Sequence, residues 1–275
     1  MPSAEKELGV YLGDQAEALI AHDIAANPDA DAVHDVRVAA RRIRSVARVF
    51  GAVLDPATAG HIDTELAWYQ DLLGALRDAQ LQCERLLAAF DDLEPSDVRG
   101  PVRERISRHL GAQQQDAHDA VSAALRSRRY RTMLADVASF AERPPLQAGA
   151  ADADLRDQVG RAQTKAARRL RCGLRAGDTV LLHRARKATK RARYATESVR
   201  GSLGEDESAA AIERYKQVQD VLGGYQDAVG AIALLHRLAD RASQGGEDDH
   251  TYRVLAHSEE ETCRSAREAA RRLSL

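Results

Sequence analysis

Two copies of one basic motif dominate the chemistry that this sequence can perform. The first copy runs from His34 to Arg44 and the second from His183 to Arg193, at an offset of 149 residues. Both follow the pattern His-x2-Arg-x3-(Arg or Lys)-Arg-x-Arg. Positions three and four apart share one face of an α-helix, with their side chains about 5–6 Å apart. Each copy therefore predicts a cationic stripe along a helix.

The makeup of these stripes favours a ligand rich in phosphate groups. A planar guanidinium group donates two parallel hydrogen bonds to phosphate oxygens, and a row of such groups suits an extended chain of phosphates. No acidic residue lies between Thr179 and Thr196, so the cations there repel one another instead of forming salt bridges. We therefore expect a linear polyanion to bind. The expected contacts within the two motifs or shortly after them are His34, Arg37, Arg41, Arg42, Arg44, Arg48, His183, Arg186, Lys187, Lys190, Arg191, Arg193 and Tyr194.

Charge is concentrated around the second motif, although the whole chain has a formal net charge of only −2. Residues 151–203 contain fourteen Lys and Arg against five Asp and Glu. Within this stretch Arg161, Lys165 and Arg168 follow one another at helical spacing. We add these three residues to the expected polyanion contacts.

The two motif histidines are the only ones among nine that the 149-residue offset relates. His34 and His183 are each expected in the first turn of a helix, where free backbone N–H groups attract anions. We interpret them as phosphate ligands that gain charge as the pH falls from about 8 to about 6. Helix capping and ligation of a shared metal ion are the alternatives, although no carboxylate or cysteine lies at ligand spacing. We expect neither a metal nor a cofactor.

A second pair of segments repeats at the same offset and without a gap, which indicates an internal duplication. Gln70-Asp71-x2-Gly74-x3-Asp78 recurs as Gln219-Asp220-x2-Gly223-x3-Asp227. The glycine would let another helix approach closely, and its neighbouring carboxylates share the same helix face. We interpret these carboxylates as partners that orient the arginines, with catalysis as the alternative.

The elements that must position these residues are helices. Aromatic residues make up only 4% of the chain and charged residues 30%, with Ala, Leu and Arg abundant. Pro and Gly divide the chain into helices expected at 3–26, 30–54, 57–90 and 96–126, and again at 152–175, 179–203, 206–239 and 245–275. The first expected helix ends at Asn27-Pro28, and Asp29 and Asp178 are expected to cap the two basic helices.

The predicted fold is all-α, with two tandem four-helix bundles related by an internal pseudo-two-fold axis. Residues 1–126 would form the first four-helix repeat and 151–275 the second. Residues 127–150 would contain a short helix, to about residue 140, and a linker. The whole chain, 1–275, would form a single domain.

Three separated cysteines indicate neither a disulfide framework nor a thiolate metal site. The N-terminal residues lack a basic segment followed by an apolar run, and no stretch approaches the length of a membrane span. We therefore expect a cytoplasmic protein without a membrane partner.

The chain resembles the CHAD domain family along essentially its whole length. Val33-His34-x2-Arg37, Leu182-His183-x2-Arg186 and the two Leu-Gly-x3-Asp-Ala segments carry the resemblance. Ser127-x-Arg129-Tyr130 is similar to the motif between that family's repeats, which adds Arg129 and Tyr130 to the candidate contacts. The resemblance implies two four-helix bundles that bind inorganic polyphosphate along a basic central surface, without enzymatic activity. Members are often fused to a CYTH-type triphosphatase domain, whose E-x-E-x-K signature this sequence lacks, so we expect a stand-alone binder at polyphosphate granules.

Two other functional classes compete with polyphosphate binding. A metal-dependent phosphohydrolase or phosphotransferase acting on polyphosphate would need an acidic metal-binding cluster near the stripes. A helical scaffold for nucleic acid or an acidic protein would also use a basic face. The stripes contain almost no aromatic residues for base stacking, which argues against specific nucleic-acid binding.

Overall fold

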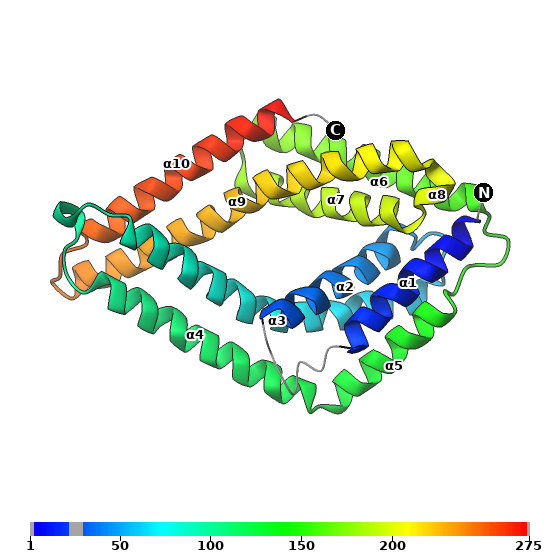
Figure 1. Cartoon of the computed structure of the whole chain (residues 1–275), viewed down its shortest axis with the longest axis horizontal. Coiled ribbons are helices and arrows are strands. Elements are labelled where there is room, and N and C mark those ends of the chain that lie inside the picture. The colour runs from blue at the N-terminus through cyan, green and yellow to red at the C-terminus, as the bar shows by residue number, and fades with distance from the viewer. Residues whose placement is uncertain (1–2, 22–29, 274–275) are drawn as a thin grey trace.

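The computed structural model describes residues 3–21 and 30–273, and helices make up its regular structure (Figure 1). The first half contains α1 (Ala4–Ala21), α2 (Ala30–Val49), α3 (Pro56–Asp91), the 3-10 turn Pro95–Asp97 and α4 (Val102–Leu125). After α5 (Arg128–Glu142), the second half contains α6 (Asp152–Ala176), α7 (Thr179–Ser198), α8 (Arg200–Leu203), α9 (Glu205–Gln244) and α10 (His250–Arg272). The predicted all-α fold is confirmed.

The helix bounds follow the internal duplication. Shifting α2 by 149 residues gives 179–198, the bounds of α7, and the same shift carries the start of α3 onto the start of α9. Neighbouring helices also pack in the same sequence, since α1 contacts α2 and α2 contacts α3, as α6 contacts α7 and α7 contacts α9. The relation of the halves by a pseudo-two-fold axis stays a prediction.

Local chemistry sets the start of the second basic helix. Gly177 ends α6 with a φ of +62°, a left-handed conformation that glycine adopts without steric cost. The side chain of Asp178 then accepts a hydrogen bond of 2.7 Å from the backbone N–H of Leu181, as predicted for this cap. The corresponding Asp29, and the expected helix end at Asn27-Pro28, lie outside the described residues.

Several predicted helices differ from the observed ones at their ends, including the one expected over 206–239, which runs to Gln244, and the one expected over 179–203, which breaks at Val199. The helix expected over 30–54 ends at Val49, because the following turn pairs with the linker: the N–H of Gln147 donates to the carbonyl of Val53 over 2.9 Å. The helix expected from 96 begins at Val102, directly after Pro101. The last helix begins at 250 rather than 245, beyond the Gly245-Gly246 turn.

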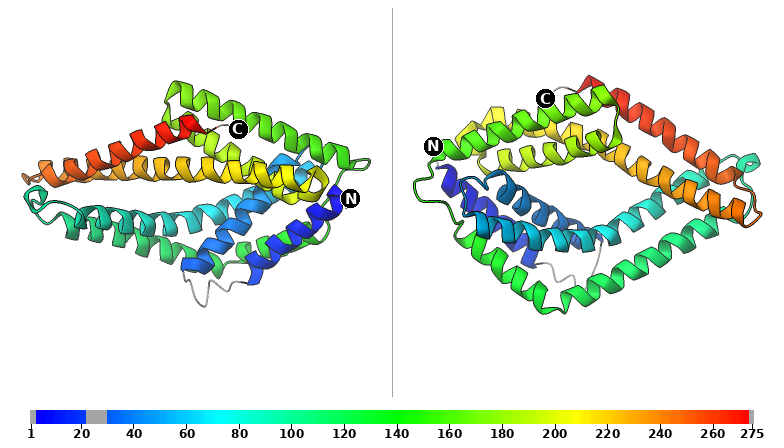
Figure 2. Two further views of the ribbon diagram at one scale, coloured as in Figure 1. Left: turned by 45° about the horizontal axis from the view of Figure 1, so that its top comes forward. Right: turned by 180° about the vertical axis from the view of Figure 1, so that it is seen from behind.

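Two of the hydrophobic cores contain residues of both halves. One core joins α1, α2, α3 and α5 to Leu155 and Val159 of α6, to Ala195 of α7 and to Val199, which follows α7. A second core lies where the far ends of the α3–α4 and α9–α10 hairpins meet, away from the chain ends (Figures 1 and 2). Between these regions α2 packs directly against α7. The duplicated basic helices are therefore brought together at the junction of the halves.

In the described ranges, no helix combines the length and the apolar character needed to cross a membrane. Cys83, Cys172 and Cys263 are all free thiols. Cys172 is exposed, and the other two are half-buried on α3 and α10.

Candidate anion-binding site

The contact between α2 and α7 merges the two predicted stripes into one group of cations. Arg41 of α2 is among the charges that lower the pKa values of both Arg186 and Lys190 of α7. Arg37 also lowers the pKa of Lys190. We call Arg37, Arg41, Arg186 and Lys190 the central cluster. It takes two cations from each repeat.

Lys190 is the most strongly perturbed member of the central cluster. Its pKa falls to about 6, mainly because the ammonium group is buried, and further because Arg41 and Arg186 lie close to it. Within the described part of the chain, neither Lys190 nor Arg41 has a side-chain hydrogen bond or an ion pair with a carboxylate. No carboxylate in the described residues thus compensates Lys190 or Arg41, and the neighbouring arginines favour the neutral form of the Lys190 amine in the unliganded protein.

Arg186 is also incompletely satisfied. Its Nε is buried and has no hydrogen-bond partner. Burial lowers its pKa, and Asp227 opposes that shift. A buried N–H that lacks a partner costs free energy unless a ligand or water accepts its hydrogen bond. An oxyanion bound at the central cluster could accept this hydrogen bond and remove the cost.

Arg37 has one carboxylate partner, Asp78 of α3. Its Nη2 donates to Oδ1 of Asp78 over 3.2 Å, while Gln70 donates to the backbone carbonyl of Arg37. Asp78 is 73% exposed and Arg37 only 17%, so water screens most of the attraction. This contact agrees with the prediction that the repeated carboxylates orient arginines. Asp71 and Asp220 are exposed.

The repeated glycines make room for the arginines. A Cβ built at Gly223 would lie 3.4 Å from Nη2 of Arg186, and one built at Gly74 would lie 3.9 Å from Nη2 of Arg37. Each pair matches the other at the 149-residue offset. The glycine predicted to let a helix approach therefore accommodates a guanidinium group of the basic helix.

Replacing Gly223 with Ala is expected to reduce affinity for a phosphate ligand by about two- to fivefold, because the added Cβ would lie 3.4 Å from Nη2 of Arg186, the close limit of ordinary contact, and would restrict the movement of that guanidinium toward a ligand. Gly74→Ala is the matched control, since its Cβ meets Arg37 at an ordinary contact distance. Both changes should stabilise the protein by up to about 1 kcal/mol through helix propensity. Titration calorimetry and thermal unfolding measure the two effects, and equal affinities for both variants would contradict the assignment.

The two motif histidines lie in different environments. Nδ1 of His183 is 3.0 Å from Oε1 of Gln226. Burial lowers the pKa of His183, and Lys187 adds to the shift, so the ring favours the neutral form in the unliganded protein. His34 is exposed near the start of α2. Lys187 itself is exposed on α7.

A carboxylate missed by the sequence analysis neutralises part of the motifs. Glu197 lies 3.6 Å from Nε of Arg42 and 3.1 Å from Nε of Arg193. Arg42 also donates to Gln15 over 3.0 Å. Tyr194 lies under both guanidinium groups and is only 2% exposed. This part of the predicted site therefore forms a supporting network beside the central cluster.

The remaining motif cations gather toward α6. Arg44 and Arg48 both donate to Asp63 of α3, over 3.0 and 2.7 Å. Burial opposes ionisation of Asp63, but these two hydrogen bonds hold its pKa below the ordinary value. Arg191 is half-buried, and its pKa is lowered by burial and then by Arg48 and Arg169.

These cations border a cavity of about 410 Å³, which we call the lateral pocket. Its lining residues are Arg48, Val49, Gln158, Arg161, Ala162, Lys165, Arg169, Ala188 and Arg191. The predicted Arg161 and Lys165 thus lie together with two motif residues, whereas Arg168 is exposed beside Lys165 and lowers the pKa of that lysine. Arg169 was missed, although it stands four residues after Lys165.

Arg77 was also missed at the central cluster. It is half-buried on α3, donates to Gln80 over 2.9 Å and is one of the cations that lower the pKa of Arg37. Its position directly before Asp78 in the repeated segment was the available signal.

Arg129 and Tyr130 lie at the contact between α5 and α3. Arg129 donates to both oxygens of Glu65, over 2.7 and 3.0 Å, and its guanidinium lies 4.2 Å from the centre of the Trp68 ring. The rings of Tyr130 and Tyr69 are 5.4 Å apart. These contacts attach α5 to α3 and give both residues a structural role.

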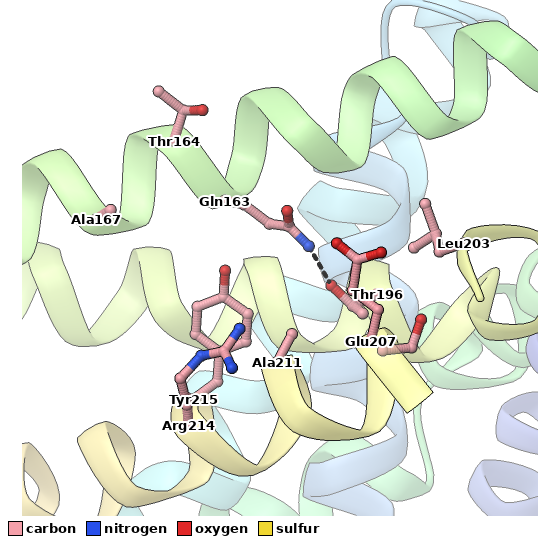
Figure 3. A pocket seen from close by; sticks show the side chains of 10 residues that line it. Gln163, Thr164, Ala167, Thr196, Leu203, Glu207, Ala211, Arg214 and Tyr215 are labelled. Atoms are coloured by element: carbon pink, nitrogen blue, oxygen red, sulfur yellow. Dashed lines mark hydrogen bonds between the residues drawn. The ribbon is translucent and has the colours of Figure 1, made fainter. Parts of the chain in front are cut away.

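Another cavity, of about 360 Å³, lies between α6, α7 and α9 (Figure 3). Gln163 donates to Thr196 across it, and Tyr215 and Arg214 project toward it from α9. Arg214 is the offset counterpart of Glu65, which binds α5 in the first half. The residues that line this cavity are mostly neutral. The central cluster, which is rich in cations, is therefore the candidate anion site. Among the described residues, no group of three or more His, Cys, Asp or Glu could hold a metal ion.

Comparison with known proteins gives a match to a family, relatives in sequence and solved structures of similar fold. The CHAD domain family matches residues 10–236. Uncharacterized proteins from two strains of Mycobacterium tuberculosis are each 34% identical over 271 residues, which is 95% of this chain and 52% of the relative. The chain therefore spans about half the length of the curated relatives it matches.

Two solved structures resemble the fold closely. PptA from Streptomyces chartreusis aligns over 99% of both chains, with a TM-score of 0.84 and 23% identity. The CHAD domain from the plant Ricinus communis aligns over 98% of this chain and 92% of that chain, with a TM-score of 0.71 and 23% identity. At this level of identity the two structures establish the fold alone.

Proposed function

Because this chain belongs to the CHAD domain family, we propose that it binds inorganic polyphosphate at the junction of α2 and α7 without altering it chemically. The observation that carries the proposal is the central cluster. Lys190 lies among arginines from both repeats and has no carboxylate partner in the described part of the chain. A polyanion would supply the missing negative charge.

The geometry favours a linear phosphate polymer over a single small anion. Cations line α2 from Arg37 to Arg48 and continue across the helix contact to Arg186 and Arg191. Such a row offers donors to several successive phosphates. Binding that neutralises several phosphates releases counterions and therefore weakens steeply as salt is added.

The proposed absence of turnover rests on how the nearest carboxylates are used. Asp78 forms an ion pair with Arg37, and Asp227 raises the pKa of Arg186, so both act on arginines. A phosphohydrolase would instead need carboxylates placed to hold a catalytic metal ion.

A direct assay separates binding from the competing functions. We expect labelled polyphosphate to bind the chain and to stay intact during incubation with Mg²⁺ or Mn²⁺. We also expect single-stranded DNA of equal charge to compete poorly, because the cluster presents few aromatic rings for base stacking. Release of phosphate would establish an enzyme, and equal competition by DNA would establish a general polyanion scaffold.

The same ligand would place the protein in the cytoplasm, at polyphosphate granules. A fluorescent fusion should co-localise with a polyphosphate stain and become diffuse when cellular polyphosphate is depleted. A distribution that ignores depletion would contradict this location.

A further inference from the structure

The two ends of the α2–α7 pair differ in charge. At one end Arg42 and Arg193 share the carboxylate of Glu197. At the other end, the residue at the position equivalent to Glu197 is Arg48, and the equivalent of Arg42 is Arg191. Arg48 lowers the pKa of Arg191 where Glu197 would have raised it. At each end two arginines thus share one carboxylate, Glu197 at the first and Asp63 at the second, but the second end also carries Arg191 and the cations of α6 and so has the larger excess of positive charge.

The cationic end opens into the lateral pocket, whose lining contains five cations and no acid. The pocket's lysine, Lys165, has its pKa lowered first by Arg169 and also by burial and Arg191. Asp63 is the nearest carboxylate to act on Arg191, but it already accepts hydrogen bonds from Arg44 and Arg48. The cations of the pocket therefore repel one another with little compensation.

A continuous series of contacts joins the lateral pocket to the central cluster. Gln70 donates to the backbone carbonyl of Arg37, and its own Oε1 accepts a hydrogen bond of 2.5 Å from Arg44. Arg44 shares Asp63 with Arg48, which lines the pocket. Arg44 and Arg48 thus continue the row of α2 cations from Arg37 and Arg41 toward the lateral pocket, and a phosphate chain can follow that row.

We propose that the lateral pocket is a second phosphate subsite for the same polymer, so that a bound chain leaves the central cluster on the α6 side only. This inference rests on the proposed function. At the Glu197 end, Arg42 and Arg193 already share a carboxylate and lie over the buried Tyr194 ring, so this end does not hold the polymer. Affinity should consequently increase with chain length until the polymer also fills the lateral pocket.

The test compares a short with a long ligand in a variant of the lateral pocket. In the double variant Lys165→Gln/Arg169→Gln, affinity for long-chain polyphosphate should fall by about tenfold or more, because two phosphate contacts are lost. Affinity for tripolyphosphate, which the central cluster can hold alone, should be unchanged. Arg171→Gln/Arg175→Gln is the matched control, since it removes two exposed charges from the same helix.

The possible outcomes separate the subsite from the proposed function. If the wild-type protein binds neither ligand, the proposed function fails. If it binds both, but the Lys165/Arg169 variant loses affinity for neither or for both equally, the lateral subsite is refuted. Equal losses in the control variant would also refute it, because a general charge effect would then explain the change. Thermal unfolding of each variant verifies that the fold is retained.

Discussion

Replacing Lys190 with Glu is expected to lower polyphosphate affinity by about 100-fold while making the unliganded protein more stable. In the wild-type protein Lys190 is half-buried among Arg37, Arg41 and Arg186, so desolvation and repulsion oppose folding with its amine charged. A glutamate there would attract the same arginines, with an expected gain of about 1 kcal/mol or more. The same glutamate would repel a polyanion, which is why affinity falls.

Opposite signs of the two effects distinguish a ligand site from a structural ion pair. Arg264→Glu is the control, because Arg264 is exposed on α10 and its replacement changes the net charge equally. Arg267 would be a poor control, since it donates to the hydroxyl of Tyr225 over 2.7 Å. Calorimetry measures affinity and chemical denaturation measures stability. A variant that loses both together would indicate that Lys190 supports the fold instead.

The second large effect is a dependence of affinity on pH that arises from Lys190. Its pKa of about 6 means that the amine is mostly neutral above neutral pH in the free protein. A bound polyanion favours the charged form, so binding takes up a proton. Affinity should fall as the pH rises above about 6, by up to about tenfold per pH unit. His183 contributes in the same direction at lower pH, because its pKa is lowered as well.

Lys190→Arg is the matched variant for this prediction, since arginine keeps its charge throughout the range. It should bind with a flatter pH profile and take up fewer protons, as calorimetry in buffers of different ionisation enthalpy would measure. The stability of the free protein should also depend on pH through Lys190. Because the folded pKa lies below the unfolded value of 10.5, Lys190 makes the protein more stable as the pH rises from about 6 to 10.5. An unchanged pH profile in the variant would assign the effect to the histidines or to the ligand.

The fold was largely predictable because its signals are local. The cap Asp178 and the breaker Gly177 define the start of α7, and the 149-residue offset transfers helix bounds between the halves. One of the wrong helix ends arises where a distant segment intervenes. The end of α2 depends on the linker that pairs with Val53, and no periodicity within residues 30–54 contains that information.

The site was predictable as a set of charges but not as a set of partners. The spacing of the cations in the sequence indicated the stripes that contain Arg37 and Arg186. The two stripes come together because the duplicated helices α2 and α7 contact each other. Neutralisation by Glu197 and Asp63 could not be anticipated, because both contacts depend on how helices cross in space. Arg129 was assigned by a motif between the repeats, whereas its observed partners are on α3.

The central claim is that cations from both repeats form one site, and the stoichiometry of tripolyphosphate binding tests it most directly. A calorimetric titration should show one tight binding event per chain. Arg37→Gln and Arg186→Gln should each weaken that same event, because the two residues act on one ligand across the α2–α7 contact. Two equal binding events in the wild-type protein, with each variant removing one of them, would contradict the account.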